Sequence, residues 1–381
     1  MTNNDQPITR GTILRIIAKA ALLFVLLNLI YAWANPLATL GRTSIYNWLV
    51  PGRERIPFGE NPASYNLSLF QLDAMFASHE VSAPKPADEY RVLVIGDSSV
   101  WGILLHPNDT LAGKLNELRL TTPDGRPIRA YNLGYPTISV MKDLMILDRA
   151  MAYQPDLIIW PTTLEAMPSK KQTTSPIVQH NAETVLALID RYHLPINPND
   201  PAFVHPTFLD RTIIGQRRDL ADLLRLNMYG FLWASTGIDQ LYPETYELRA
   251  EDLEASEDFY GLPKPLRRED LAFEELQAGI ERAGVAASQL HVPVLIVNEP
   301  MFISEGQNSD IRYNFYYPRW AYDDYRRLMS ETAESNGWYY LDAWNIINGA
   351  EFTNSAIHLT PKGEEQLAAV IAEEIMHLIE R

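Results

Sequence analysis

The sequence predicts an α/β protein built on a parallel sheet, with a mostly helical insertion and an N-terminal transmembrane helix. Three observations lead to this fold class. Short apolar runs alternate with amphipathic helical segments, a proline-rich stretch of about a hundred residues lacks that alternation, and residues 13–34 are almost wholly apolar. Alternating strands and helices favour a parallel sheet. The 381 residues, 46% of them hydrophobic, can bury a large core in one elaborated domain or two.

Composition excludes several classes of protein. The formal net charge of −16 argues against a nucleic-acid partner, because a binding protein needs a basic face to meet phosphates. The sequence contains no cysteine, so disulfides, thiolate catalysis and cysteine-ligated zinc are excluded. No histidine and carboxylate cluster has zinc spacing, and Gly96 with Gly102 does not make a dinucleotide fingerprint. We therefore expect no metal and no cofactor.

Residues 1–35 are expected to form a cytoplasmic tail and a membrane anchor. The apolar segment reaches about 20 residues if Lys19 snorkels, which is enough to cross a bilayer. Arg15 and Lys19 lie at its N-terminal end, so the positive-inside rule places everything after Ala34 outside the cytoplasm. A cleaved signal peptide is the first alternative, because Ala32-Trp33-Ala34 has the form of a cleavage site. A buried core helix is the second.

Residues 36–88 are predicted to form a stalk or neck, since they carry scattered prolines and one amphipathic piece at 67–76. Pro84-Lys85-Pro86 would end this region as a stiff connector. The main body of the chain then spans residues 89–381.

The body begins with the strand–helix alternation. Its first half predicts strands at 92–95, 128–133 and 157–160, with helices at 111–118 and 139–153. Residues 168–271 form a helical insertion or lid, with helices at 183–192 and 219–234. The sequence from 220 to 233 is notably apolar, as in a helix packed on the core; a membrane-facing or acyl-binding surface is the alternative. The second half predicts helices at 273–290 and 361–379, a third helix ending near 336, and strands at 292–297 and 338–341.

Ser98 is the best candidate nucleophile. It follows an apolar strand and Gly96-Asp97, and in open α/β sheets chemistry gathers where strands end. A plain strand and turn is the alternative, because Gly-Asp-Ser is common turn sequence. A serine hydroxyl needs a base. His358 is the best of the eight histidines, since it stands in a loop directly before the last helix.

Four blocks, in order and spacing, resemble the SGNH (GDSL-type) hydrolase superfamily. They are Gly96-Asp97-Ser98 with Gly102, Asn132-Leu133-Gly134, the strand opened by Pro155-Asp156, and His358-Leu359-Thr360-Pro361-Lys362-Gly363. The matched regions cover about half the chain. The resemblance implies a three-layer α/β/α flavodoxin-like fold and ester hydrolysis or acyl transfer. It also implies that Ser98 is the nucleophile, that His358 is the general base, and that the backbone N–H groups of Ser98 and Gly134 line the oxyanion hole.

The chain departs from the family pattern at two positions. Where the family has an oxyanion-hole asparagine, this chain has Glu165, so Thr162 or Thr163 would have to substitute unless the site works differently. Where the family has an aspartate three residues before the histidine, this chain has Ser355, next to Asn354.

Three groups are therefore considered as the partner that orients His358. They are a backbone carbonyl, the neutral pair Asn354 or Ser355, and a carboxylate such as Asp342 or Glu165. We favour Asn354 or Ser355.

The predicted function is that of an extracytoplasmic, membrane-anchored esterase or acyltransferase that acts on an acyl ester, with cell-envelope carbohydrate as the expected substrate. A lipase-like esterase acting on lipid or small acyl esters is one alternative. A non-catalytic binding or assembly protein that retains the fold is the other. The sequence does not indicate an oligomeric state.

Overall fold

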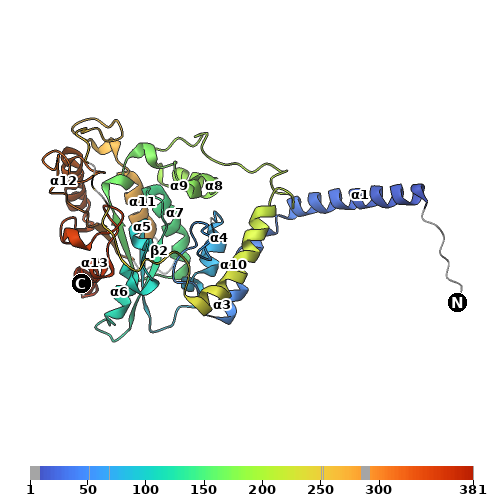
Figure 1. The fold of residues 1–381 in the computed structure, drawn as a ribbon, viewed down its shortest axis with the longest axis horizontal. Helices are drawn as coiled ribbons and strands as arrows, with labels where there is room; N and C mark the ends of the chain where they lie inside the picture. The colour runs from blue at the N-terminus through green and yellow to red at the C-terminus, as the bar shows by residue number, and fades with distance from the viewer. Residues whose placement is uncertain are drawn as a thin grey trace.

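Five parallel strands form a single sheet in a computed structural model of the chain (Figure 1), which describes residues 9–50, 52–67, 69–249, 251, 253–284 and 292–380. The strands are β1 (Tyr90–Gly96), β2 (Ile128–Gly134), β3 (Leu157–Thr162), β4 (Val294–Asn298) and β5 (Tyr339–Asp342). Their spatial order is β2-β1-β3-β4-β5, which is the flavodoxin order. The predicted α/β fold class is confirmed.

Helices cover both faces of the sheet and make three layers. They are α5 (Ser98–Trp101), α6 (Leu111–Glu117), α7 (Val140–Ala150), α11 (Phe273–Gly284), α12 (Arg319–Asn336) and α13 (Pro361–Ile379). Leu93 and Ile158 point to the face where α7, α11 and α12 pack, whereas Val92 and Ile159 point to the face of α6 and α13. Because both faces are covered, β1 is buried at every position, which explains its unbroken apolar run.

The predicted elements of the body lie within a few residues of the observed ones. The helix predicted at 273–290 is described as far as Gly284, and the rest of that prediction lies outside the described residues. The carboxyl ends of β1 and β2 are in register, with Gly96 opposite Gly134. This register places the turn after β1 beside the end of β2.

The helices of the insertion between β3 and α11 lie mainly within residues 164–192 and 217–236. Its elements are η4 (Leu164–Ala166), η5 (Ser169–Lys171), α8 (Pro176–His180), α9 (Ala182–Tyr192), α10 (Arg217–Thr236) and η6 (Arg268–Asp270). Between α10 and η6 the described chain is irregular.

Residues 36–88 are the segment predicted as a stalk or neck that leads to the body. They contain α2 (Leu37–Leu40), α3 (Ile45–Leu49), α4 (Leu72–Ser78) and η1 (Glu80–Ser82), and they pack against the body. Ile56 and Phe76 are fully buried in the main hydrophobic core. The buried Arg55 guanidinium binds Asp239 of the insertion, with Nη2–Oδ1 at 2.5 Å and Nε–Oδ2 at 3.0 Å. Burial of the apolar side chains of residues 36–88 lowers the free energy of the folded state, and this holds the segment against the body.

Helix α1 (Arg10–Ala34) projects away from the body (Figure 1). Thr9 caps its N-terminus by accepting a hydrogen bond from the Thr12 N–H. The most apolar 18-residue window has a mean hydropathy of 2.3, and 25 residues extend over about 37 Å, against a hydrocarbon thickness of about 30 Å. By length and composition, α1 can cross a membrane.

Candidate active site

Strand β1 delivers Ser98 to the carboxyl edge of the sheet. The strand ends at Gly96, and Asp97 caps the short helix α5 by accepting a hydrogen bond from the Ser99 N–H through Oδ1 at 2.9 Å. Ser98 is the first residue of α5 and is half-buried. The serine hydroxyl is therefore held on a capped turn at the carboxyl edge of the sheet, where it is partly exposed.

The end of β2 supports this turn. A Cβ on Gly134 would lie 2.4 Å from the backbone nitrogen of Trp101, so only glycine lets α5 approach the strand so closely. Asn132 Nδ2 donates to the Val100 carbonyl at 2.7 Å. Gly102 ends α5 with φ of 82°, a left-handed conformation that favours glycine. Asn132 and Gly134 thus position the helix that carries Ser98.

His358 reaches Ser98 from the loop before α13. The loop is braced by Thr353, whose N–H donates to the His358 carbonyl at 2.8 Å. His358 Nε2 lies 2.8 Å from Ser98 Oγ, and His358 Nδ1 lies 2.8 Å from Asn354 Oδ1. When Nδ1 carries the proton and donates it to Asn354, Nε2 has a free lone pair for the serine hydroxyl. Ser98, His358 and Asn354 therefore form one continuous chain of hydrogen bonds.

The environment keeps His358 neutral. Burial lowers the pKa of His358 to about 4, and the nearby charge of Asp97 opposes this shift. At neutral pH the imidazole is uncharged, with one ring proton, and its free nitrogen can accept the proton of serine.

The other groups considered as partners of His358 have partners of their own. Asp342 accepts hydrogen bonds from Asn298 Nδ2 at 2.7 Å and from Arg326 Nη2 at 2.6 Å. Glu165 accepts hydrogen bonds from Lys171 Nζ and Tyr260 Oη. The bonds of the His358 ring go to Ser98 and Asn354, so Ser355 makes neither of them. Of the alternatives left open by the sequence, the geometry selects the neutral amide of Asn354.

The predicted oxyanion hole is only partly available. The Gly134 N–H donates to Asn132 Oδ1 at 3.0 Å, so it is not the free donor that was expected, because the asparagine side chain folds back onto it. The buried Thr163 hydroxyl shares a 2.8 Å hydrogen bond with Tyr317. The Ser98 N–H lies at the first position of α5, where the helix provides no acceptor. Compared with the Gly134 N–H and the Thr163 hydroxyl, it is the donor best placed to bind an oxyanion.

Two buried titratable side chains near the turn, Glu299 and Lys142, were not anticipated. Glu299 follows β4 and accepts a hydrogen bond from Ser99 Oγ at 2.5 Å. Burial, reinforced by the charge of Asp97, raises the pKa of Glu299 well above its usual range. The buried Lys142 donates to the Gly96 carbonyl at 2.6 Å. Glu299 could have been noticed in the sequence, because it is a carboxylate directly after an apolar strand. Lys142 lies within a helical segment, and nothing in the neighbouring sequence marks it as buried.

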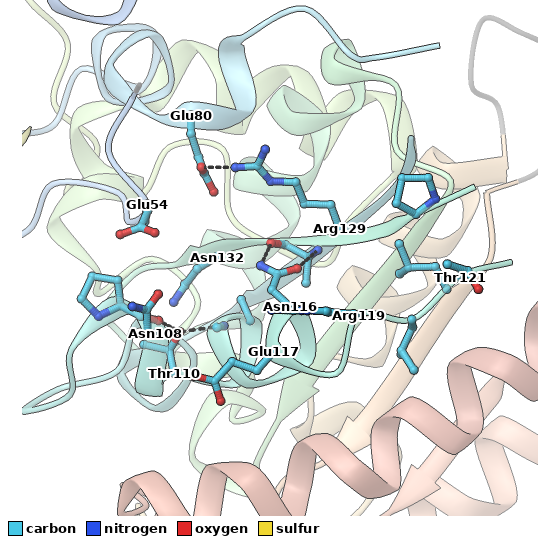
Figure 2. A pocket seen from close by; sticks show the side chains of 17 residues that line it. Glu54, Glu80, Asn108, Thr110, Asn116, Glu117, Arg119, Thr121, Arg129 and Asn132 are labelled. Carbon is cyan, nitrogen blue, oxygen red and sulfur yellow. Dashed lines mark hydrogen bonds and ion pairs between the residues drawn. The ribbon is translucent and has the colours of Figure 1, made fainter. Parts of the chain in front are cut away.

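A cavity of about 730 Å³ lies away from these residues, beside edge strand β2 (Figure 2). Glu54, Glu80 and Arg129 line it, and Arg129 Nη2 donates to Glu80 Oε2 at 2.6 Å. Burial raises the pKa of Glu80 to about 7, although Arg129 opposes the shift. Neither Ser98 nor His358 lines this cavity, so it is separate from the serine–histidine pair.

Comparisons with known proteins give similarity to solved structures only. No protein-family model matches the chain, and no curated protein matches it. A carbohydrate acetylesterase from Sinorhizobium meliloti has a TM-score of 0.37 at 13% identity, with 76% of this chain and 99% of that chain covered. The aryl esterase of M. smegmatis has a TM-score of 0.36 at 12% identity, with 76% and 99% covered. A lipolytic protein of the G-D-S-L family from Desulfitobacterium hafniense has a TM-score of 0.35 at 11% identity, with 74% and 98% covered.

Proposed function

We propose that the chain is a membrane-anchored serine esterase of the SGNH (GDSL-type) superfamily that acts on an acyl ester. The observation that carries the proposal is the hydrogen-bonded series Ser98–His358–Asn354, with 2.8 Å at each step. A nucleophile bonded to a base, and the base bonded to an orienting group, is the signature of an activated serine.

The proposed reaction proceeds by covalent catalysis. Ser98 Oγ attacks the ester carbonyl carbon while its proton passes to His358 Nε2. The tetrahedral intermediate carries a negative oxygen, which the Ser98 N–H stabilises. When the C–O bond to the leaving alcohol breaks, Nε2 returns the proton to that alcohol, and an acyl-serine remains. A second hydroxyl, from water or from a sugar, then repeats these steps and releases the acyl group.

Asn354 holds the histidine in the productive tautomer without carrying charge. A carboxylate in this place would also stabilise the imidazolium that forms in the transition state. The amide supplies orientation and a dipole only, so we expect a slower enzyme than one with an aspartate at this position.

The proposed location is outside the cytoplasm, with α1 as the anchor. Arg10, Arg15 and Lys19 lie on the N-terminal side of the apolar stretch, and the positive-inside rule then leaves the sheet on the opposite side of the membrane. An esterase or acyltransferase tethered there meets acylated carbohydrate of the cell envelope, and we propose this as the substrate class.

The test is hydrolysis of p-nitrophenyl acetate by the full-length protein in detergent. Ser98→Ala and His358→Ala are each expected to lower kcat/KM by about a thousandfold or more. Ser335→Ala, which removes an exposed hydroxyl on α12, serves as the control and should keep full activity. Equal hydrolysis by Ser98→Ala and the unchanged protein would contradict the proposal, and inactivity of the unchanged protein on every ester would favour a binding protein. O-acetylated polysaccharide compared with phospholipid and triglyceride then separates the carbohydrate esterase from the lipase-like alternative.

A further inference from the structure

The side of the body from which α1 leaves carries a concentration of exposed apolar side chains. Beyond α1, most of the exposed large hydrophobic residues of the described chain fall in two segments, 40–49 and 204–241. Soluble monomers rarely expose large contiguous apolar patches, and such patches mark contact with another protein or a membrane.

Helix α10 presents two opposite apolar faces. Leu226, Gly230 and Trp233 are buried, at the spacing of one helical face. Leu224, Met228, Phe231 and Leu232 recur at i, i+4, i+7 and i+8 on the other face, and Leu224 is 64% and Met228 58% exposed. Packing on the core accounts for the first face only.

Helix α3 is fixed against α10 and extends the same exposed surface. A Cβ on Gly230 would lie 2.1 Å from the ring of Tyr46, and Asn227 Oδ1 accepts a hydrogen bond from the Ile45 N–H at 2.8 Å. While Tyr46 is buried against α10, Trp48 of the same short helix is 75% exposed. The two helices therefore pack together as one unit whose outer side is apolar.

This unit is continuous with the proposed membrane anchor. Only ten residues separate the end of α1 from the start of α3. The loop before α10 also contacts α1 directly, since the Ile214 N–H donates to Asn28 Oδ1 at 3.4 Å. Figure 1 shows α10 lying between the sheet and the point where α1 leaves the body.

We propose that the outer face of α10, together with the exposed side chains of α3, lies in the interface of the same bilayer that α1 crosses. We call this surface the interfacial face. It is made of the exposed apolar side chains of Ile45, Trp48, Leu49, Leu224, Met228, Phe231 and Leu232. An amphipathic helix lying in the membrane plane buries its apolar side chains at the boundary between headgroups and acyl chains. Trp48 has the amphipathic side chain favoured at that depth. The inference rests on the anchoring part of the proposed function and adds a second, fixed contact that orients the enzyme on the membrane.

The test uses the absence of cysteine from the chain. Single cysteines at Leu224→Cys and Met228→Cys in the full-length protein are labelled with an environment-sensitive nitrobenzoxadiazole dye. The proteins are reconstituted in vesicles of equal parts phosphatidylcholine and phosphatidylglycerol, with and without doxyl-labelled lipid as a quencher. Leu118→Cys is the matched control, because Leu118 is a leucine that is 43% exposed outside the two apolar segments. Trp33→Cys, at the end of α1, reports on the anchor.

Blue-shifted emission and doxyl quenching at positions 224 and 228, with neither at 118, are the expected result. The dye at positions 224 and 228 could instead emit at the wavelength seen at position 118 and remain unquenched, while the dye at position 33 is quenched. That result would overturn the interfacial face and leave the anchor intact. Absence of quenching at position 33, with no flotation of the protein with the vesicles, would overturn both the anchor and the interfacial face. A blue shift at 224 that grows with protein density but is not quenched by doxyl lipid would assign the face to a second copy of the chain and also overturn the proposal.

Discussion

Replacing Asn354 by aspartate should raise kcat/KM and move the acid limb of the pH–rate profile to higher pH. Asn354 Oδ1 accepts a hydrogen bond from His358 Nδ1, with the two atoms 2.8 Å apart. An aspartate in the same rotamer would place a carboxylate about 4 Å from the centre of the imidazolium charge. Two such charges attract by about 1 kcal/mol in water and about 4 kcal/mol at the effective dielectric of a protein surface. Asn354 is exposed, which favours the lower half of that range.

The expected gain in kcat/KM is therefore about tenfold, with a hundredfold as the upper end. The same attraction raises the pKa of His358 from about 4 by about one to two units. Asn354→Ala removes the orienting acceptor and should lower kcat/KM by about ten- to a hundredfold. Both effects are read from pH–rate profiles of kcat/KM on p-nitrophenyl acetate between pH 3 and 9.

Asn348→Asp is the matched control. It adds the same charge in the same C-terminal region, and aspartate can replace the asparagine that accepts a hydrogen bond from the Ala350 N–H. Its profile should match that of the unchanged protein. If Asn354→Asp and Asn354→Ala both keep kcat/KM within twofold and the acid limb unmoved, Asn354 does not orient His358.

Three further outcomes are expected. In the unchanged protein kcat/KM should hold from pH 7 downward and reach half its value near pH 4, because burial keeps His358 neutral; a midpoint near pH 6.5 would show an ordinary, solvated histidine. Glu364→Gln should raise the melting temperature by an amount that grows between pH 5 and pH 8. Burial raises the pKa of Glu364 to about 8, so the folded state keeps a proton that the unfolded state releases above about pH 4.5, and stability is lost as pH rises; a pH-independent difference would contradict this. Asp239→Asn should cost about 3–5 kcal/mol of stability, since it leaves the buried guanidinium of Arg55 without its charge partner, and an unchanged melting temperature would show that this pair does not hold the 36–88 segment to the insertion.

The sequence predicted the parts of the site that depend on local pattern. Ser98 and His358 stand where a strand ends and where a helix begins, and both positions can be recognised from neighbouring residues. The sheet was likewise predictable, because strands buried on both faces leave continuous apolar runs.

Other features depend on contacts between distant segments and left no local sign. Asn354 could be named as a candidate partner of His358, but the choice between it and a carboxylate depends on how Asp342 is paired. The engaged N–H of Gly134 follows from the rotamer of Asn132, which a motif does not specify.

The packing of the 36–88 segment against the body left no local sign for the same reason. Its prolines indicated a stalk, but its burial depends on partners in the insertion almost two hundred residues later, such as Asp239. Lys142 resembles any solvated lysine on a helix until the Gly96 carbonyl is seen beside it.

The most direct test of the central claim is the site of covalent labelling by a fluorophosphonate, which reacts with activated serine hydroxyls. Full-length protein is treated at pH 7.5, and the adduct is mapped by tandem mass spectrometry of the peptide that contains both Ser98 and Ser99. A single adduct on Ser98 is expected, absent from Ser98→Ala and strongly slowed in His358→Ala. An adduct that persists in Ser98→Ala, or no adduct on the unchanged protein, would contradict the claim that Ser98 is the nucleophile.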